Sequence, residues 1–245
     1  MAVNRDSNGY TFGFAIALVV VVGVLLAGIA MWTKPFQEKN QKVKKQMDIL
    51  KAILTDDEYE KIDRKNAPEE FKKYVNLDDA VVLDMNGNIQ EDVKAFDVNI
   101  KKQFRDKKLK EEDKEYPLFI ATIDGKTAYV IPVVGKGLWG PIWGNLCIDA
   151  DMRTIKGASF DHKSETPGLG AEIKQNFFIK GWIGEKIADE NMNFQKFEVV
   201  KDKSGSTKES KVDGITGGTI TSKGVEEMVN RCLLPYVAYF KTLKK

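Results

Sequence analysis

An uncharged segment near the N-terminus limits what this chain can be more than any other feature. No charged residue occurs between Ser7 and Thr33. As a helix, the core from Phe12 to Trp32 would be about 31 Å long, which matches the hydrocarbon thickness of a bilayer. The apolar region of a cleaved signal peptide is usually shorter, about 7–15 residues. We therefore expect an uncleaved transmembrane helix over residues 12–32, preceded by a tail of residues 1–11.

The charges that flank this segment bear on its orientation. Five lysines follow it within a short stretch, and the N-terminal flank has one arginine and one aspartate: Lys34, Lys39, Lys42, Lys44, Lys45, Arg5 and Asp6. Positive flanks favour the cytoplasmic side, so this bias alone would place the following domain in the cytoplasm. The bias weakens when a long domain follows the span.

The remaining residues are enough for one soluble domain with its own core. Val43, Met47, Leu50 and Leu54 recur at helical spacing, which predicts a membrane-proximal helix within residues 33–55. A soluble domain is expected over residues 56–245. Residues 56–76 are charged and are expected to be helical or irregular.

Strand patterns follow in pairs. Apolar runs flank Asn86-Gly87 and again Asp124-Gly125, and both dipeptides are typical of tight β-hairpin turns. A third pair is expected around a polar turn at residues 149–153, and the run FEVV at 197–200 predicts another strand. Strand pairs with helices at both ends indicate an α+β fold with a mainly antiparallel sheet and flanking helices.

Three other segments are expected to be helical or irregular. Residues 101–115 are dense in charge and suggest an exposed helix or loop, and residues 166–190 suggest a short helix. A final helix is expected over about 223–241, with Ser222 as its N-cap. Pro235 is expected to kink or interrupt that helix.

Composition excludes several classes of function. The formal net charge is only +2, so nucleic-acid binding, which needs a strongly basic face, is not indicated. Cys147 and Cys232 lie far apart in apolar settings, which favours two buried thiols over a disulfide and predicts no metal site. The lone histidine, His162, is expected at a loop or strand end.

Glycine-rich segments carry the functional signal. The first, GKGLWGPIWG over 135–144, has two tryptophans, and Trp139 or Trp143 could stack on a planar ring. Both could equally fill the core. The second, HKSETPGLGAE over 162–172, has Pro167-Gly168 as a turn signal. Gly168, Leu169 and Gly170 there could present backbone N–H groups to a ligand, although a structural turn is an equal reading.

The third segment, DGITGGTITS over 213–222, leads directly into the final helix. Free backbone N–H groups and the helix dipole favour a negative group at such a position. Phosphate binding and a plain capping loop are comparable readings of this loop. It lacks the lysine of a Walker A loop, and no Gly-x-Gly-x-x-Gly follows a strand, so a nucleotide-binding fold is not indicated.

Together these segments resemble a known family. DGITGGT is similar to the Asp-Gly-x-Ser/Thr-Gly-Ala-Thr signal at which a flavin transferase attaches FMN to the last threonine. With GLWGPIWG, DHKSETPGLGAEI and one N-terminal span, the chain resembles the C subunit of the Na⁺-translocating NADH:quinone oxidoreductase. Gly218 stands where the family signal usually has alanine.

The resemblance implies a membrane-anchored flavoprotein subunit that relays electrons with other subunits and is not active alone. FMN would be joined through its phosphate to Thr219, which is an attachment point and not a catalytic residue. Asp213, Thr216, Gly217 and Gly218 would form the loop that the flavin transferase reads. The remaining implied cofactor contacts are Trp139, Glu165, Thr166, Gly168, Leu169 and Gly170. The soluble domain would lie on the periplasmic side of the inner membrane, against the lysine bias.

Two alternatives stay open at this level. The G subunit of an Rnf-type electron-transfer complex has the same covalent FMN loop. The other alternative is a membrane-tethered assembly module without a redox role, in which Thr219 would be an ordinary hydroxyl near a helix start.

Overall fold

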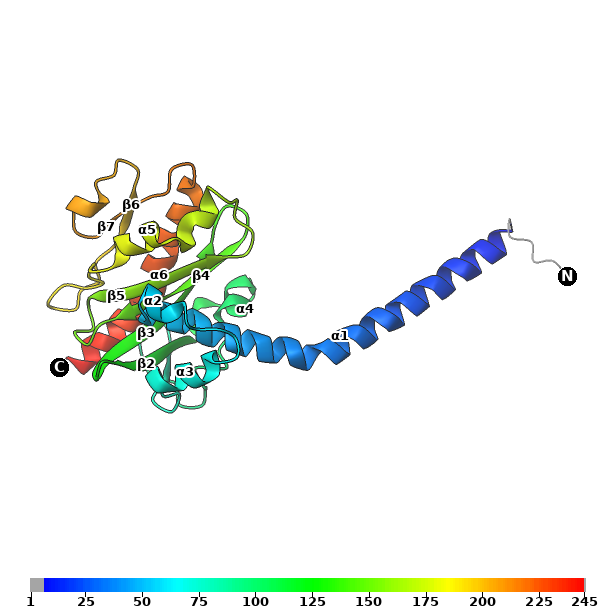
Figure 1. Ribbon diagram of the computed structural model, residues 1–245, viewed down its shortest axis with the longest axis horizontal. Coiled ribbons are helices and arrows are strands. Elements are labelled where there is room, and N and C mark those ends of the chain that lie inside the picture. Colours follow the sequence, from blue (N-terminus) through cyan, green and yellow to red (C-terminus); the bar gives the residue numbers. More distant parts are fainter. Residues whose placement is uncertain (1–6, 245) are drawn as a thin grey trace. The chain divides into compact units, whose positions relative to one another are not determined.

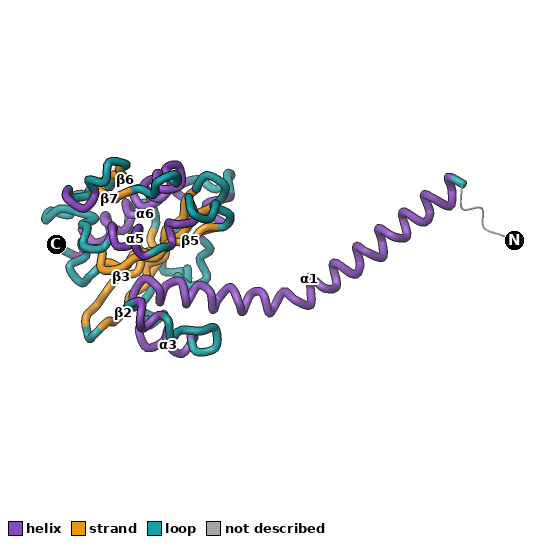
Figure 2. Tube along the Cα trace, turned by 45° about the horizontal axis from the view of Figure 1, so that its top comes forward, coloured by secondary structure: helices purple, strands orange, loops and turns teal. Residues whose placement is uncertain are grey.

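The computed structural model describes residues 7–244, and the chain divides into two compact units on either side of the boundary between Lys45 and Gln46. The helices are α1 (Asn8–Ile53), α2 (Asp56–Tyr59), α3 (Ala67–Tyr74), α4 (Ile100–Arg105), α5 (Asn176–Ile179) and α6 (Thr219–Leu243). Short 3₁₀ segments are η1 (Glu111–Asp113), η2 (Gly170–Lys174), η3 (Lys180–Trp182) and η4 (Gly205–Thr207). The strands are β1 (Val81–Leu83), β2 (Tyr116–Ile123), β3 (Lys126–Lys136), β4 (Pro141–Ile148), β5 (Ile155–His162), β6 (Glu198–Val200) and β7 (Lys211–Asp213) (Figures 1 and 2).

Helix α1 includes the whole uncharged segment and continues without a break through Pro35. The apolar side chains of the segment are exposed: Phe12 is 69% and Trp32 is 73% accessible. Within residues 7–244, no other helix is long and apolar enough to cross a bilayer. The expected tail, with Arg5 and Asp6, lies mostly outside the described residues.

Strands β1 to β5 form one antiparallel sheet in sequence order. The turn between β2 and β3 is Asp124-Gly125, with φ angles of 51° and 73°. Two successive positive φ angles are the mark of a type I′ turn, which matches the twist of a hairpin. The predicted hairpins β2–β3 and β4–β5, and the mainly antiparallel α+β fold, are confirmed.

The predicted hairpin at Asn86-Gly87 is only partly present. The turn forms, with Gly87 at a φ of 83°, but the strand expected after it is reduced to one bridge between Leu83 and Ile89. Strand β1 pairs with β2 instead. The reason is packing, because Gly87 lies against the backbone of α6, where an added Cβ would be 2.6 Å from the nitrogen of Tyr239.

Both faces of the sheet are covered. Residues of β3 to β5 form one core cluster with the buried side of α6, including Met228, Leu233 and Tyr236. On the opposite face, the hydroxyl of Ser159 donates to the carbonyl of Asp48 in the last turns of α1 at 3.1 Å. At Gly157 a Cβ would be 2.2 Å from the carbonyl oxygen of Ala52, so the sheet and α1 touch directly there.

Helix α6 differs from expectation at two positions. It begins at Thr219, four residues before the predicted start, and its N-cap is Gly218 and not Ser222. It also continues through Pro235 to Leu243, so the predicted interruption is wrong. Proline removes one helical hydrogen bond, but the buried side chains on both sides of it, Leu233 and Tyr236 among them, hold the helix against the sheet.

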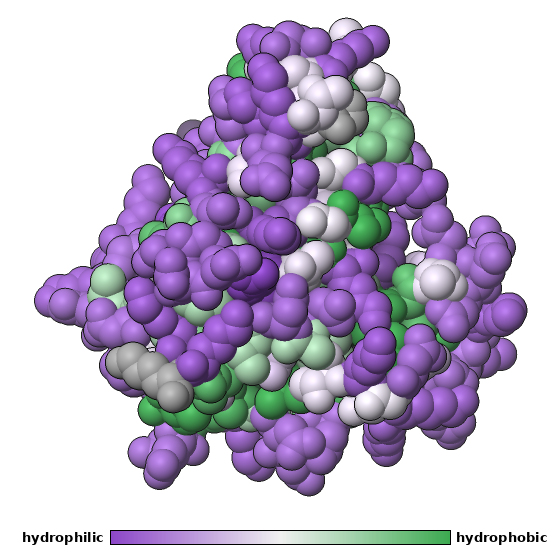
Figure 3. All heavy atoms as spheres, turned by 90° about the vertical axis from the view of Figure 1, so that its left-hand side faces the viewer, coloured by the Kyte–Doolittle hydropathy of each residue, from purple (hydrophilic) through white to green (hydrophobic). Residues whose placement is uncertain are grey.

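The remaining segments follow the sequence more closely. Residues 166–190 contain three short helical pieces, η2, α5 and η3, and the charged stretch 101–115 contains α4 and η1. The predicted strand at FEVV is β6, and it pairs in parallel with β7, which the sequence did not indicate. Figure 3 shows that hydrophilic side chains cover most of one face of the molecule, with hydrophobic ones in small separate patches.

Candidate functional site

The loop before α6 is a closed turn with little freedom. The N–H of Gly218 donates to the carbonyl of Ile215 at 2.9 Å, and Gly217 between them has a φ of 75°. A positive φ at the third residue is the mark of a type II turn, where glycine is preferred. The hydroxyl of Ser222 accepts from the N–H of Ile215 at 3.0 Å and donates to the carbonyl of Gly218 at 2.9 Å. Ser222 therefore holds the turn from inside the helix.

Thr219 is the first residue of α6 and is half-buried. Among residues 7–244, the N–H groups of Thr219, Ile220 and Thr221 have no hydrogen-bond acceptor, and the first turn has no acidic residue. Free N–H groups at the start of a 25-residue helix, with its dipole, create a partial positive charge. The position suits an anion bound to, or carried by, the hydroxyl of Thr219.

A pocket opens beside that hydroxyl. Its volume is about 170 Å³. Strand β6, the turn and the first residues of α6 line it: Val199, Val200, Lys201, Gly214, Ile215, Thr216, Gly217, Thr219, Ser222 and Lys223. Lys223 pairs with Glu226 at 2.6 Å, and Lys201 has no ion pair among the described residues. Two ammonium groups beside three hydroxyls make this pocket suitable for a phosphate group.

Glu165 joins all three glycine-rich segments. Its side chain is only 5% exposed, and its Oε1 accepts from the backbone N–H of Trp139 at 2.8 Å. Its Oε2 accepts from the hydroxyl of Thr221 at 2.5 Å. Its own N–H donates to Nδ1 of His162 at 3.1 Å. The segments that the sequence singled out separately are therefore one connected unit.

Two apolar side chains are exposed beside this unit. Trp139 is 66% and Leu169 is 42% accessible. Leu169 lies on the turn before α6, where a Cβ added to Gly217 would be 2.6 Å from its Cδ2. Trp143 is half-buried, with the ammonium of Lys101 3.4 Å from the centre of its ring. Trp139 is thus free to contact a planar ligand, and core filling is the wrong interpretation for it.

The other expected site residues shape the loops. The carboxylate of Asp213 accepts from the N–H of Gly205 at 2.8 Å and so fixes the loop before β7. The carbonyl of Thr166 accepts from the N–H groups of Leu169 and Ala171, both at 3.1 Å. Gly168 is exposed with a φ of 76°. The hydroxyl-bearing Thr216 is exposed at the rim of the pocket.

The structure therefore brings Glu165, Leu169, Gly170, Gly217 and Trp139 into one neighbourhood around the start of α6, with Thr219 at its first residue. Sequence reasoning did not select Thr221, Lys201 or Lys223. Thr221 stands in the same hydroxyl-rich run and could have been found there. Lys201 had no such signal, because only the fold brings the end of β6 to the helix start, whereas Lys223 directly follows the motif and could also have been found there.

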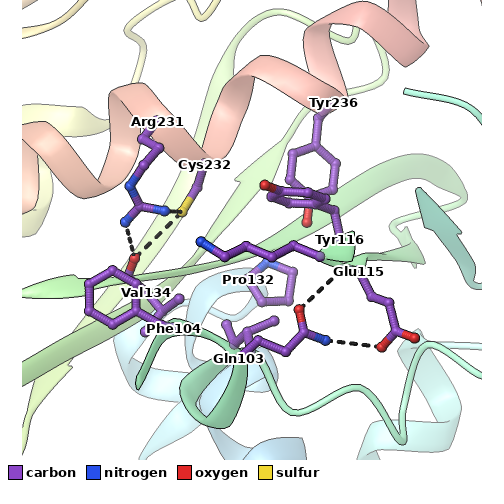
Figure 4. Close-up of a pocket in the computed structure, with 11 residues that line it drawn as sticks. Gln103, Phe104, Glu115, Tyr116, Pro132, Val134, Arg231, Cys232 and Tyr236 are labelled. Carbon is purple, nitrogen blue, oxygen red and sulfur yellow. Dashed lines mark hydrogen bonds between the residues drawn. The ribbon is translucent and has the colours of Figure 1, made fainter. Parts of the chain in front are cut away.

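A second, smaller cavity lies further along α6, and its volume is about 20 Å³, room for about one water molecule (Figure 4). The guanidinium of Arg231 donates to the carbonyl of Val134 at 2.7 Å and to Glu227 at 2.5 Å. Burial raises the pKa of Cys232 and that of Tyr116, the latter to about 12. Cys232 is buried, whereas Arg231 and Tyr116 are half-buried, and the hydrogen bonds of this group to neighbouring residues are typical of a structural cluster.

The two cysteines and the histidine lie where the sequence predicts. Cys147 and Cys232 are both buried free thiols, as expected. Burial raises the pKa of Cys147 to about 12, so this thiol stays protonated and unreactive. His162 ends strand β5, also as expected. Among the residues that the structure describes, no group of histidine, cysteine or acidic side chains could hold a metal ion.

Comparisons with known proteins bear on this site. A family described as "FMN-binding domain" matches residues 137–234, a range that contains all the expected site residues. The C subunit of the Na⁺-translocating NADH-quinone reductase of Neisseria meningitidis is 30% identical, over 91% of this chain and 88% of that protein. The corresponding protein of Haemophilus ducreyi is 28% identical over 97% of this chain and 96% of its own length.

A solved structure agrees. The C subunit of the same enzyme from Parabacteroides distasonis is 35% identical, covers 86% of this chain and 97% of its own, and superposes with a TM-score of 0.71. The described architecture, an N-terminal apolar helix and an antiparallel sheet with helices, matches that fold. The chain belongs to the family formed by the C subunits of Na⁺-translocating NADH-quinone reductases.

Proposed function

We propose that this chain is the flavoprotein subunit of a Na⁺-translocating NADH-quinone reductase and that Thr219 carries FMN through a phosphoester bond. The relatives bear the name of the C subunit of that enzyme, and the matching family is described as FMN-binding. In this role the chain relays electrons between partner subunits and has no activity by itself.

The observation that carries the proposal is the setting of the Thr219 hydroxyl. It stands at a helix start where the N-cap, Gly218, offers no side-chain hydrogen bond and three N–H groups are free. A phosphodiester keeps about one negative charge, which the helix dipole stabilises by about 0.3–1 kcal/mol at an exposed site. Lys201 lines the same pocket and adds positive charge, whereas the charge of Lys223 is balanced by Glu226. A plain capping loop would not need this arrangement.

Chain residues would divide the work of holding the cofactor. The pocket beside Thr219 suits the phosphate, and the exposed Trp139 and Leu169 offer apolar surface to the flavin ring. FMN itself supplies the redox chemistry when bound. The loop residues Asp213, Thr216, Gly217 and Gly218 would be the part that a flavin transferase recognises. Glu165, Thr166, Gly168 and Gly170 would support the neighbouring loop.

The N-terminal helix would anchor the protein. We propose that residues 12–32 cross the inner membrane once, with residues 1–11 before the span, 33–55 as a membrane-proximal helix and 56–245 as the FMN-binding domain. The soluble domain would lie on the periplasmic side. Lysines after the span oppose this orientation, but a long domain can be exported despite flanking charge.

The attachment is tested by producing the full chain together with a flavin transferase and resolving it on a denaturing gel under ultraviolet light. We expect a fluorescent band, and an intact mass increased by one FMN less one water. Thr219→Ala should lose both signals. The matched control is Thr127→Ala, which removes an exposed threonine hydroxyl on β3, outside the attachment loop, and should keep both. A fluorescent Thr219→Ala chain, or a dark wild-type chain, would contradict the proposal.

A further inference from the structure

Glu165 is unusual for its burial. Among the side chains that the structure describes, no other aspartate, glutamate, lysine or arginine is buried. Its two oxygens accept from the N–H of Trp139 and the hydroxyl of Thr221, and no cation forms an ion pair with it among the described residues. A buried carboxylate without a counter-charge is costly and is generally tolerated where it has a specific role.

The surrounding chain makes room for this carboxylate. A Cβ on Gly137 would be 2.6 Å from its Oε1, and a Cβ on Gly170 would be 2.5 Å from its Oε2. No side chain fits at either position without displacing the carboxylate or the backbone. Glycines from two different glycine-rich segments thus enclose Glu165, which explains their presence better than close approach to a ligand does.

The carboxylate also acts on the helix that would carry the cofactor. Thr221 is the third residue of α6 and Thr219 is the first. The hydrogen bond from Thr221 therefore ties the first turn of the helix to the loops at Trp139 and at Glu165 itself. The bond is charge-assisted, and such bonds are about twice as strong as those between neutral groups.

We propose that Glu165 is a positioning residue for the flavin, and that its buried negative charge makes the flavin harder to reduce. The proposal rests on the proposed attachment of FMN to Thr219. Reduction adds electron density to the flavin, and a fixed negative charge nearby opposes that addition. The opposition is stronger than in water, because the effective dielectric constant near buried groups is about 20.

Two substitutions separate charge from packing. Glu165→Gln keeps the size of the side chain, with its carbonyl facing the N–H of Trp139 and its amide facing the oxygen of Thr221. It removes the charge and reverses the direction of the hydrogen bond with Thr221, but leaves the volume of the side chain unchanged. Thr221→Val keeps the charge and the shape of the residue but removes the hydroxyl donor that partly neutralises the carboxylate. Thr221→Ser, which keeps the hydroxyl, is the matched control.

The test is a redox titration of the flavin in the purified full chain, with the thermal unfolding temperature measured in parallel. We expect a more positive midpoint potential for Glu165→Gln, a more negative one for Thr221→Val, and no shift for Thr221→Ser. A general loosening of the flavin site would shift the midpoint potentials of Glu165→Gln and Thr221→Val in the same direction. If Glu165→Gln does not fold, a more negative potential in Thr221→Val at an unchanged unfolding temperature, with no shift in Thr221→Ser, supports the role of Glu165, and any other pattern overturns it.

An unchanged potential in Glu165→Gln, or equal signs for it and Thr221→Val, would overturn the role of Glu165. These outcomes leave the attachment intact, because the wild-type chain would still show covalent flavin. A wild-type chain without covalent flavin would instead overturn the proposed function. The two failures are therefore distinguishable in one set of samples.

Discussion

At the scale of single residues, the neighbouring glycines 217 and 218 have different roles. Gly217 has a φ of 75°, a conformation that costs other residues about 1–3 kcal/mol, and it packs against Leu169. Gly218 has a φ of −102°, which any residue adopts. A Cβ there would be 3.0 Å from the carbonyl oxygen of Leu169, a tight contact that a small shift relieves.

This difference predicts opposite outcomes for two alanine substitutions. Gly217→Ala should lower the free energy of unfolding by about 1–3 kcal/mol and reduce the fraction of chains that carry flavin. Gly218→Ala, which restores the usual residue of the family signal, should change stability by less than about 1 kcal/mol and keep the flavin. Denaturant unfolding and in-gel fluorescence measure both. Equal losses of stability and flavin in the two variants would show that the positive φ of Gly217 is not what makes this residue necessary.

Whether a contact could be predicted from the sequence depended on how far apart its residues lie along the chain. The turn and the hydroxyl of Thr219 lie within one short motif, so they could be identified from neighbouring letters. The contacts of Glu165 could not, because Trp139 and Thr221 are 26 and 56 positions away from it. The family resemblance predicts that Glu165 contacts the cofactor, and only the fold shows what its carboxylate binds.

At the scale of elements, the turn sequences predicted the hairpins, and tertiary packing altered one of them. Asp124-Gly125 connects β2 and β3 as predicted, and a Cβ on Gly125 would meet nothing within 4 Å. The turn at Asn86-Gly87 lies on α6, and the strand after it is lost. The run FEVV predicted β6, but its parallel partner β7 had no signal in the sequence, since a strand of three residues has too little periodicity to recognise.

The two turns provide a matched test of this packing. Gly87 and Gly125 both have positive φ angles, 83° and 73°. A Cβ on Gly87 would be 2.6 Å from the nitrogen of Tyr239, whereas one on Gly125 would have open space around it. We expect Gly125→Ala to cost about 1 kcal/mol of stability and Gly87→Ala at least about 2 kcal/mol. Urea unfolding of the detergent-solubilised chain measures both, and equal costs would contradict the docking of the turn on α6.

At the scale of the whole molecule, the sequence predicted most of the order of helices and strands. It did not predict on which side of the membrane the domain lies. An apolar run, paired strands and a closing helix predicted the architecture, because each depends on periodicity over many residues. The side of the membrane depends on how the chain is inserted. The flanking lysines and the family resemblance give opposite answers to that question.

Protease protection tests the proposed orientation. Protease added to intact spheroplasts should digest the soluble domain if it faces the periplasm, and an epitope at the C-terminus should disappear. A cytoplasmic protein in the same cells is the control and should survive until lysis. Digestion that occurs only after lysis would place the domain in the cytoplasm and would agree with the lysine bias.

Among the described residues, helix α6 comes after all five strands of the main sheet in chain order. It supplies a large part of the core that covers one face of the sheet, and it begins with Thr219. On a ribosome, the apolar sheet face therefore has no cover until the codons of α6 have been read. A prematurely terminated chain would lack both that cover and a properly formed attachment helix, so we expect proteolysis to remove it before it competes for a place in the membrane assembly.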